Sequence, residues 1–415
     1  ALVVRADTDG SLDKALARGH ATSLVVTLGG LIGTCLWLSP PAFWPAATIA
    51  GAAGLAAVTA AAFARRFGFE RRSTGQRELG EWLRLGDTPT LAAGLADGLR
   101  SVVLPAALLG AAISIAWSAG LASGVPHGGV FAALVALMSM LAPAANFLAA
   151  RTLSAVTASV RSAPNALGEE EGEVAARARR LETTSLLASA MARVYLAEIG
   201  CATAWFCVVA AVTGEPLALS RASSLDSPMG LFVGALGGCL VLWYAGSGLR
   251  AALRGTRAVV LEVQRQLRGH GRERGAIVLP EDFTPSYKNC IDESAGAARR
   301  GLVWPPALAV LSPAALGIAL SLLYRRSQPE VAGGGLVTFV VVTALTALGV
   351  SLVADAASAT FVASRRMGNP TLPGFHAAVS GDAAAQLIGD SIGSAAHLLA
   401  KSVAVVCLML APFLL

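Results

Sequence analysis

Apolar residues occur in long runs along this chain. Nine runs are long enough to cross a bilayer, which takes about 20 apolar residues per helix. They lie at about 21–38, 42–64, 101–123, 129–150, 185–213, 229–248, 302–324, 333–360 and 395–415. An open sheet edge cannot be satisfied by lipid, so each run is expected to be a helix. The pattern predicts an all-α, polytopic membrane helix bundle that forms one domain over residues 1–415.

Composition places the chain in the same class. Hydrophobic residues make up 55% of it and charged residues 14%, and the mean hydropathy is +0.63. A soluble globular protein of this length would carry more charge. These values therefore exclude a soluble enzyme and support a membrane protein.

The basic residues predict the orientation in the membrane, because cytoplasmic loops concentrate Lys and Arg. With the N-terminus inside, the cytoplasmic loops are about 65–100, 151–184, 249–301 and 361–394. The loops on the opposite side contain only three Lys or Arg residues, Arg221, Arg325 and Arg326. We therefore expect a cytoplasmic N-terminus and an outside C-terminus. The Ala- and Arg-rich, Lys-poor usage fits a bacterium with GC-rich codons, so the expected location is the bacterial inner (cytoplasmic) membrane.

The net charge of +6 follows from this topology and does not indicate nucleic-acid binding. Residues 250–274 continue a membrane helix into the cytoplasm with arginines among apolar residues. A solvated helix face or anionic lipid headgroups would accommodate these charges. The six cysteines and five histidines show no metal-site spacing, so no zinc, haem or iron–sulfur centre is expected.

The C-terminal region carries the most specific motifs. It holds His376-Ala-Ala-Val-Ser-Gly-Asp382, then Asp390-Ser-Ile-Gly-Ser394, then Lys401 in an apolar run that closes with Ala411-Pro-Phe-Leu-Leu415. Three earlier stretches, Ala15–Gly19, Gly86–Pro105 and Phe283–Pro313, fit the same family in the same order. Together they resemble the membrane-integral, ion-pumping pyrophosphatases. Members of that family have about sixteen helices, and this chain resembles the last nine.

The resemblance implies several departures from the family's chemistry. Hydrolysis of pyrophosphate requires carboxylates that hold magnesium and cations that neutralise phosphate. Arg151, Arg179 and Val362 stand where the family has Asp, and Leu186 stands where it has Asn. Gln386 and Gly389 replace a further Asp and a Lys. The principal diphosphate motif of the family, in its N-terminal part, has no counterpart in these 415 residues.

Some family residues remain. The resemblance implies catalytic remnants at Asp382, Asp390, Glu182 and Arg365, with Asp382 and Asp390 as the magnesium ligands if any metal is bound. It also implies that Lys401 and Arg193 are remnants of the ion gate. A charge near the bilayer centre is costly, so Lys401 is expected to pair with Asp355 or Glu198.

Two functional hypotheses follow. The first is a degenerate, catalytically inactive pyrophosphatase-like protein that acts as a structural or interaction subunit of a larger membrane assembly and needs no cofactor. The alternative is the C-terminal part of a pyrophosphate-driven proton or sodium pump, completed by a missing N-terminal half and using magnesium and pyrophosphate. The expected partners are membrane lipids and other membrane subunits, as a homo- or hetero-oligomer.

Overall fold

Almost all of the described chain is helical, which confirms the predicted all-α fold. The computed structural model describes residues 12–70, 82, 84–143, 228–268, 272–273, 276–277, 280, 283–301, 303–324, 329–367 and 374–414. Its α-helices are α1 (Leu12–Leu38), α2 (Trp44–Glu70), α4 (Asp87–Ser101), α5 (Val103–Ala122), α6 (Gly128–Leu141), α11 (Pro228–Leu267), α12 (Tyr287–Gly301), α13 (Trp304–Tyr324), α14 (Pro329–Met367), α15 (Phe375–Leu387) and α16 (Ser394–Leu414). A π-helical segment, η1 (Ile388–Gly393), connects α15 to α16.

The membrane-spanning prediction is confirmed for seven of the nine runs. Seven helical segments in the described residues are long and apolar enough to cross a bilayer: Ala17–Leu38, Trp44–Ala64, Asp87–Ala122, Pro228–Leu267, Tyr287–Tyr324, Gly333–Ser358 and Ser391–Leu410. The run at 129–150 corresponds to α6, which ends at Leu141 and is followed by a turn at 142–143; the rest of the run lies outside the described residues. The run at 185–213 lies outside the described residues.

Several helices continue well beyond the predicted spans. α11 has 40 residues, so it is about 60 Å long at 1.5 Å per residue. That is twice the hydrocarbon thickness of about 30 Å. Much of the region predicted to form cytoplasmic loops is thus helical. An apolar run marks only the part of a helix that lies in lipid, so it does not show how far the helix continues.

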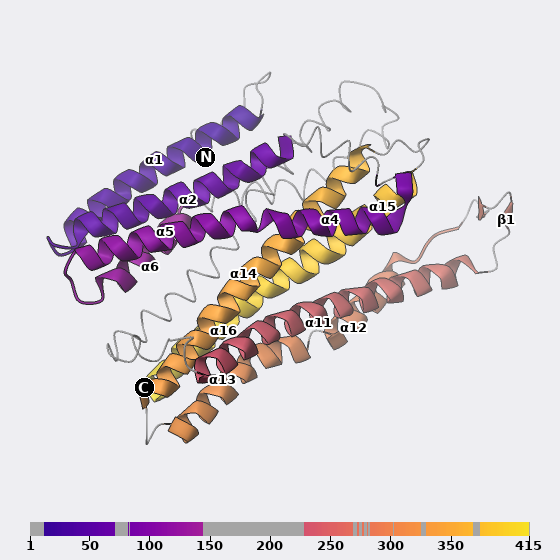
Figure 1. Ribbon diagram of the computed structural model, residues 1–415. Coiled ribbons are helices and arrows are strands. Elements are labelled where there is room, and N and C mark those ends of the chain that lie inside the picture. The colour runs from indigo at the N-terminus through magenta and orange to yellow at the C-terminus, as the bar shows by residue number, and fades with distance from the viewer. Residues whose placement is uncertain are drawn as a thin grey trace.

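The helices pack around α14. α1 packs on α2, and α2 packs on α5 and α6, while α14 contacts α4, α11 and α16. Figure 1 shows α1, α2, α5 and α6 on one side of α14 and α16, with α11, α12 and α13 on the other. α4 continues from α5 and joins the two sides by packing on α14.

Small residues allow these helices to approach closely. A Cβ at Gly54 of α2 would lie 2.8 Å or less from the backbone of Ala136 in α6. Beside it, the Ser139 hydroxyl donates to the carbonyl of Gly51 across the same interface, at 2.8 Å. Small residues and hydroxyl bonds of this kind hold membrane helices together, because lipid supplies no hydrophobic drive between them.

Gly98 is the corresponding position between α4 and α14. A Cβ there would lie 2.7 Å from the Val353 carbonyl oxygen. We expect Gly98→Val to destabilise the protein by about 1–3 kcal/mol through overpacking, and thermal unfolding in detergent measures this. Gly110→Val is the matched control, since a Cβ at Gly110 meets nothing within 4 Å. Equal melting temperatures for the two variants would contradict the close contact.

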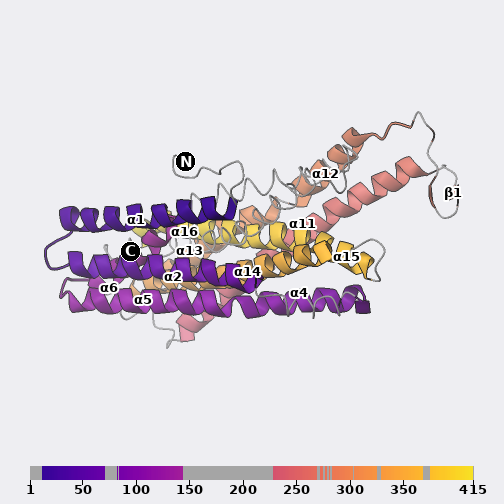
Figure 2. The same cartoon turned by 90° about the horizontal axis from the view of Figure 1, so that it is seen from above.

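A stalk projects from one end of the bundle, the end that the basic residues predict to be cytoplasmic. It consists of residues 249–267 of α11, the following Arg268, the strands β1 (Arg272–Glu273) and β2 (Ala276–Ile277), and residues 283–301. The strands pair antiparallel, with Arg272 opposite Ile277. Figure 2 shows this segment extending past the ends of α4 and α15.

A polar cluster joins the two sides of the stalk. Arg265 donates two hydrogen bonds, each of 2.7 Å, to the carboxylate of Glu262. The side-chain amide of Gln266 donates to the same carboxylate at 2.9 Å and to the Ser286 carbonyl at 3.0 Å. In return, the Ser286 amide donates to Gln266 at 2.9 Å. Gln266 therefore connects α11 to the chain that leads into α12.

The cluster makes the stalk sensitive to pH. Hydrogen bonds from Arg265 and then Gln266 lower the pKa of Glu262 to about 2. A carboxyl whose pKa is lowered on folding stabilises the fold above its unfolded pKa of about 4.5, and this stabilisation is lost as the pH falls toward 2.

We expect Glu262→Gln to speed hydrogen exchange of residues 283–290 several-fold at pH 7. After correction for intrinsic exchange, the difference from wild type should shrink as the pH falls from 4.5 toward 2. Glu293→Gln provides the control, because Glu293 is an exposed acid of the same stalk. A difference that does not change with pH would show that the charge of Glu262 does not hold the stalk.

Candidate functional site

α4, α14 and α15 meet at the end of the bundle from which the stalk projects. α15 contacts both α14 and α4, and Figure 1 shows the three helices together at that end. The Ser380 hydroxyl of α15 donates to the carboxylate of Asp87 at 3.1 Å. Residues expected from the C-terminal motif therefore lie beside the start of α4.

Local sequence explains why α4 begins where it does. Gly86 precedes it with φ 115°, a backbone conformation that glycine adopts without a Cβ penalty. Asp87 occupies the first turn, where negative charge favours the helix dipole. The Thr90 hydroxyl donates to the Gly86 carbonyl at 2.8 Å. The sequence analysis did not assign Asp87 to the site, although an acid directly after a glycine is a helix-start signal.

η1 is the least regular element of the site. It winds residues 388–393 as a π-helix, a form that is rare and found mostly at functional positions. Asp390 lies within it, and α14 packs along it. The predicted site residue is thus part of a widened turn between two regular helices.

Gly393 ends η1 and faces α14. A Cβ at Gly393 would lie 3.1 Å from a carboxylate oxygen of Asp355, whose side chain is only 7% exposed. Ser351, one turn away on α14, brings its carbonyl oxygen to 3.9 Å from the same point. The glycine therefore leaves room for a buried carboxylate between α14 and η1.

The remaining predicted site residues lie on neighbouring elements. Asp382 belongs to α15, Arg365 to the last turn of α14, and half-buried Lys401 to α16. Lys401 is eight residues beyond Gly393, about 12 Å along the helix axis. Asp355 and Asp390 are thus on packed elements, while Lys401 lies deeper in the bundle.

Three predicted site residues cannot be placed. Glu182, Arg193 and Glu198 lie outside the described residues, as do Arg151, Arg179 and Leu186. The pairing of Lys401 with Asp355 or Glu198 therefore stays a prediction.

The described acids do not form a metal site by themselves. Within the described ranges, no three His, Cys, Asp or Glu side chains gather closely enough to hold a metal ion. Magnesium is typically bound through one or two carboxylates together with substrate phosphates, so a cluster of three acids is not a requirement for it.

A family model for inorganic H+ pyrophosphatase matches residues 2–410. The chain belongs to this family. The resemblance inferred from the C-terminal motifs is confirmed, and so is the membrane character of the protein.

Curated relatives carry the same functional description. The chain is 28% identical over 79% of its length to "K(+)-insensitive pyrophosphate-energized proton pump 2" of Moorella thermoacetica, covering 47% of that protein. It is 25% identical over 96% of its length to "Pyrophosphate-energized membrane proton pump 3" of Arabidopsis thaliana, covering 52% of it. The chain thus spans about half the length of the curated relatives it matches.

These relatives favour the alternative hypothesis over the first. Their descriptions name pumps driven by pyrophosphate, and none of these comparisons points to an inactive structural subunit. The departures from the family at Val362 and Gln386 stay a prediction from the resemblance.

The contact between Gly393 and Asp355 can be tested by a double-mutant cycle. We expect Gly393→Ala to destabilise the protein by about 1 kcal/mol or more, because the added methyl group meets a carboxylate held in a packed interface. In an Asp355→Ala background the same change should cost much less. Unfolding of the four proteins in detergent measures the coupling, and additive effects would exclude the contact.

Proposed function

We propose that this chain forms the C-terminal half of a pyrophosphate-energised proton pump in the bacterial inner membrane, with its N-terminus in the cytoplasm. The observation that carries this proposal is the family match over residues 2–410 to proteins that are about twice as long. The other half would come from the same polypeptide or from a second subunit. Pyrophosphate is the implied substrate and magnesium the implied cofactor.

The arrangement supports a division between a cytoplasmic site and a membrane path. Asp87, Asp382 and Asp390 lie on elements that meet at the cytoplasmic end of the bundle. Carboxylates repel a polyanionic substrate unless metal ions or basic residues offset their charge, and the sequence offers Arg365 on α14 as one basic residue. Further ligands and cations would come from residues outside the described ranges, such as Glu182 and Arg193, and from the other half of the pump.

The membrane path would be supplied by ionisable residues within the membrane spans. Asp355 lies in the candidate span Gly333–Ser358 and Lys401 in Ser391–Leu410. Intramembrane charges are costly and commonly mark ion paths. Because α15, η1 and α16 form one continuous stretch of helix, a displacement of α15 on substrate binding would reach the helix that carries Lys401.

The inactive structural subunit is the second candidate. The resemblance implies that Arg151 and Val362 stand where the family has carboxylates, and a cation in the place of a metal ligand would repel the metal. Such a protein would keep the helix bundle and bind other membrane subunits as a homo- or hetero-oligomer without turning over pyrophosphate.

The deciding experiment uses protein purified from its native membranes, so that whatever completes it is retained. After reconstitution into vesicles, we expect magnesium-dependent phosphate release from pyrophosphate together with proton uptake. Asp382→Ala should reduce both about 100-fold or more, the scale for loss of a positioned catalytic group. Lys401→Ala should reduce proton uptake more than hydrolysis.

The control is Lys288→Ala, which removes a cation from the stalk, outside the proposed path. Absence of hydrolysis in an intact, stable complex would reject the pump and support the structural subunit. Unchanged hydrolysis in Asp382→Ala would reject the assignment of that residue while leaving the pump in place.

A further inference from the structure

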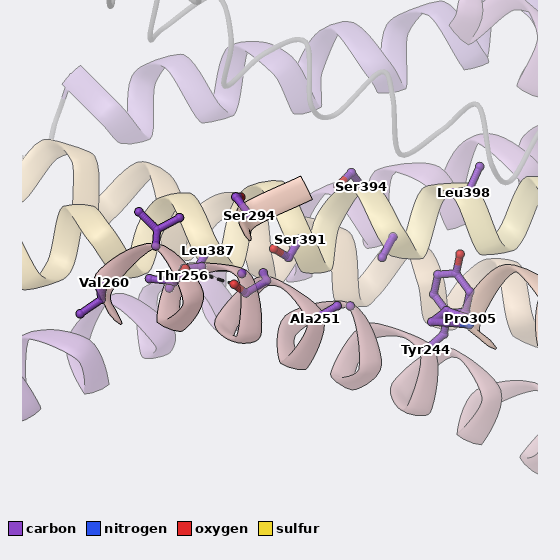
Figure 3. A pocket seen from close by; sticks show the side chains of 15 residues that line it. Tyr244, Ala251, Thr256, Val260, Ser294, Pro305, Leu387, Ser391, Ser394 and Leu398 are labelled. Carbon is purple, nitrogen blue, oxygen red and sulfur yellow. Dashed lines mark hydrogen bonds between the residues drawn. The ribbon is translucent and has the colours of Figure 1, made fainter. Parts of the chain in front are cut away.

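A groove runs along α11 where this helix leaves the membrane. It encloses about 670 Å³ between α11 on one side and the α15–η1–α16 stretch on the other. Gly248, Ala251 and Gly255 line the α11 side, and Ser391, Ala395 and Leu398 line the opposite side. Figure 3 shows these two walls, with Ser294 of α12 and Pro305 of α13 completing the outline.

The floor of the groove is set by a close helix contact. A Cβ at Gly248 would lie 3.4 Å from the Cβ of Ala395 and 3.5 Å from the Ser391 carbonyl oxygen. Two turns further on, a Cβ at Gly255 would meet nothing within 4 Å. The helices therefore touch at Gly248 and diverge toward the stalk, which opens the groove.

The groove crosses the boundary between hydrocarbon and headgroups. The predicted membrane run of α11 ends at residue 248, and α16 enters its own run at residue 395. Tyr244 and Leu398 lie on the membrane side of this level, and Gly255 lies about 10 Å beyond it at 1.5 Å per residue. The headgroup layer occupies roughly 5–7 Å on each side of the hydrocarbon core.

The groove is mostly apolar along its whole length. Leu398 and Pro305 line its membrane end, and Val259, Val260 and Leu387 line its stalk end. The hydroxyls of Ser391, Ser394, Thr256 and Ser294 lie among them. An acyl chain fits such an apolar lining, and the hydroxyls can bond to the polar part of a lipid.

A basic side chain lies next to one of the residues that line the groove. A Cβ at Gly301 would be 2.8 Å from the Cβ of Ala251, which lines the groove, and 3.4 Å from the guanidinium of Arg254. Arg254 is therefore close to the groove wall without lining it. Arg250 and Arg257 are exposed on neighbouring turns. Among the described residues the one salt bridge joins Arg265 to Glu262, so Arg254 has no acidic side-chain partner there.

We propose that this groove binds an anionic phospholipid. One acyl chain lies along the α11–α16 wall from Tyr244 to Ala251, and the phosphate lies at the rim beside Arg254. Local positive charge selects the anionic headgroup, because a basic residue at a membrane surface strengthens anionic-lipid binding about fivefold. This site is independent of whether the chain pumps protons.

The test measures lipid retention by native mass spectrometry after purification in mild detergent and addition of phosphatidylglycerol or phosphatidylcholine. Gly255→Leu fills the groove without a steric clash and replaces glycine by a better helix former, so the variant should fold. We expect it to lower phosphatidylglycerol binding at least tenfold. Gly246→Leu on the same helix is the control, because Gly246 is outside the groove and equally open.

The headgroup part of the proposal has its own variant. Arg254→Gln should weaken phosphatidylglycerol about fivefold and leave phosphatidylcholine unchanged. Equal affinity of the wild-type protein for the two lipids would overturn anionic selection. Unchanged phosphatidylglycerol binding in Gly255→Leu would overturn the groove as the site, and so would a protein helix found in the groove in the assembled complex.

Discussion

The absence of water in the bilayer is the constraint on which this structure depends. Each backbone amide and carbonyl in lipid must be satisfied within the chain, and the described spans meet this requirement as helices. Helices in lipid gain little from hydrophobic contact with each other, so they must approach closely to associate. The glycines at 54 and 98 and the bond from Ser139 to Gly51 serve that approach.

The same constraint shapes the candidate site. A carboxylate such as Asp355 needs space and polar surroundings inside a packed bundle, and the missing side chain of Gly393 supplies the space. The end from which the stalk projects has different requirements, because its polar side chains are more exposed. There the Ser380 hydroxyl of α15 donates a hydrogen bond of 3.1 Å to Asp87 of α4, and this hydrogen bond is exposed. The site therefore combines one buried acid with a more open group of polar residues.

Sequence patterns predicted the apolar spans well, because span length and hydropathy are properties of each segment alone. The continuation of a membrane helix through residues 250–274 was also predicted, from arginines that alternate with apolar residues, and it is confirmed as far as Leu267, where α11 ends. The motif around Asp382 and Asp390 located the site, but not the π-helical winding of η1 or the proximity of Asp355 to Gly393. Those features depend on packing between segments that are distant in the sequence. Glu182, Arg193 and Glu198 lie outside the described residues.

η1 has a consequence for the orientation of everything that follows it. A π-helical turn holds more residues than an α-helical turn, so the faces of α15 do not continue onto α16 by ordinary helical spacing. Asp382 and Lys401 are on opposite sides of this widened turn. Rewinding η1 into regular α-helix would rotate α16 about its own axis relative to α15, and Lys401 would then point in a new direction within the membrane.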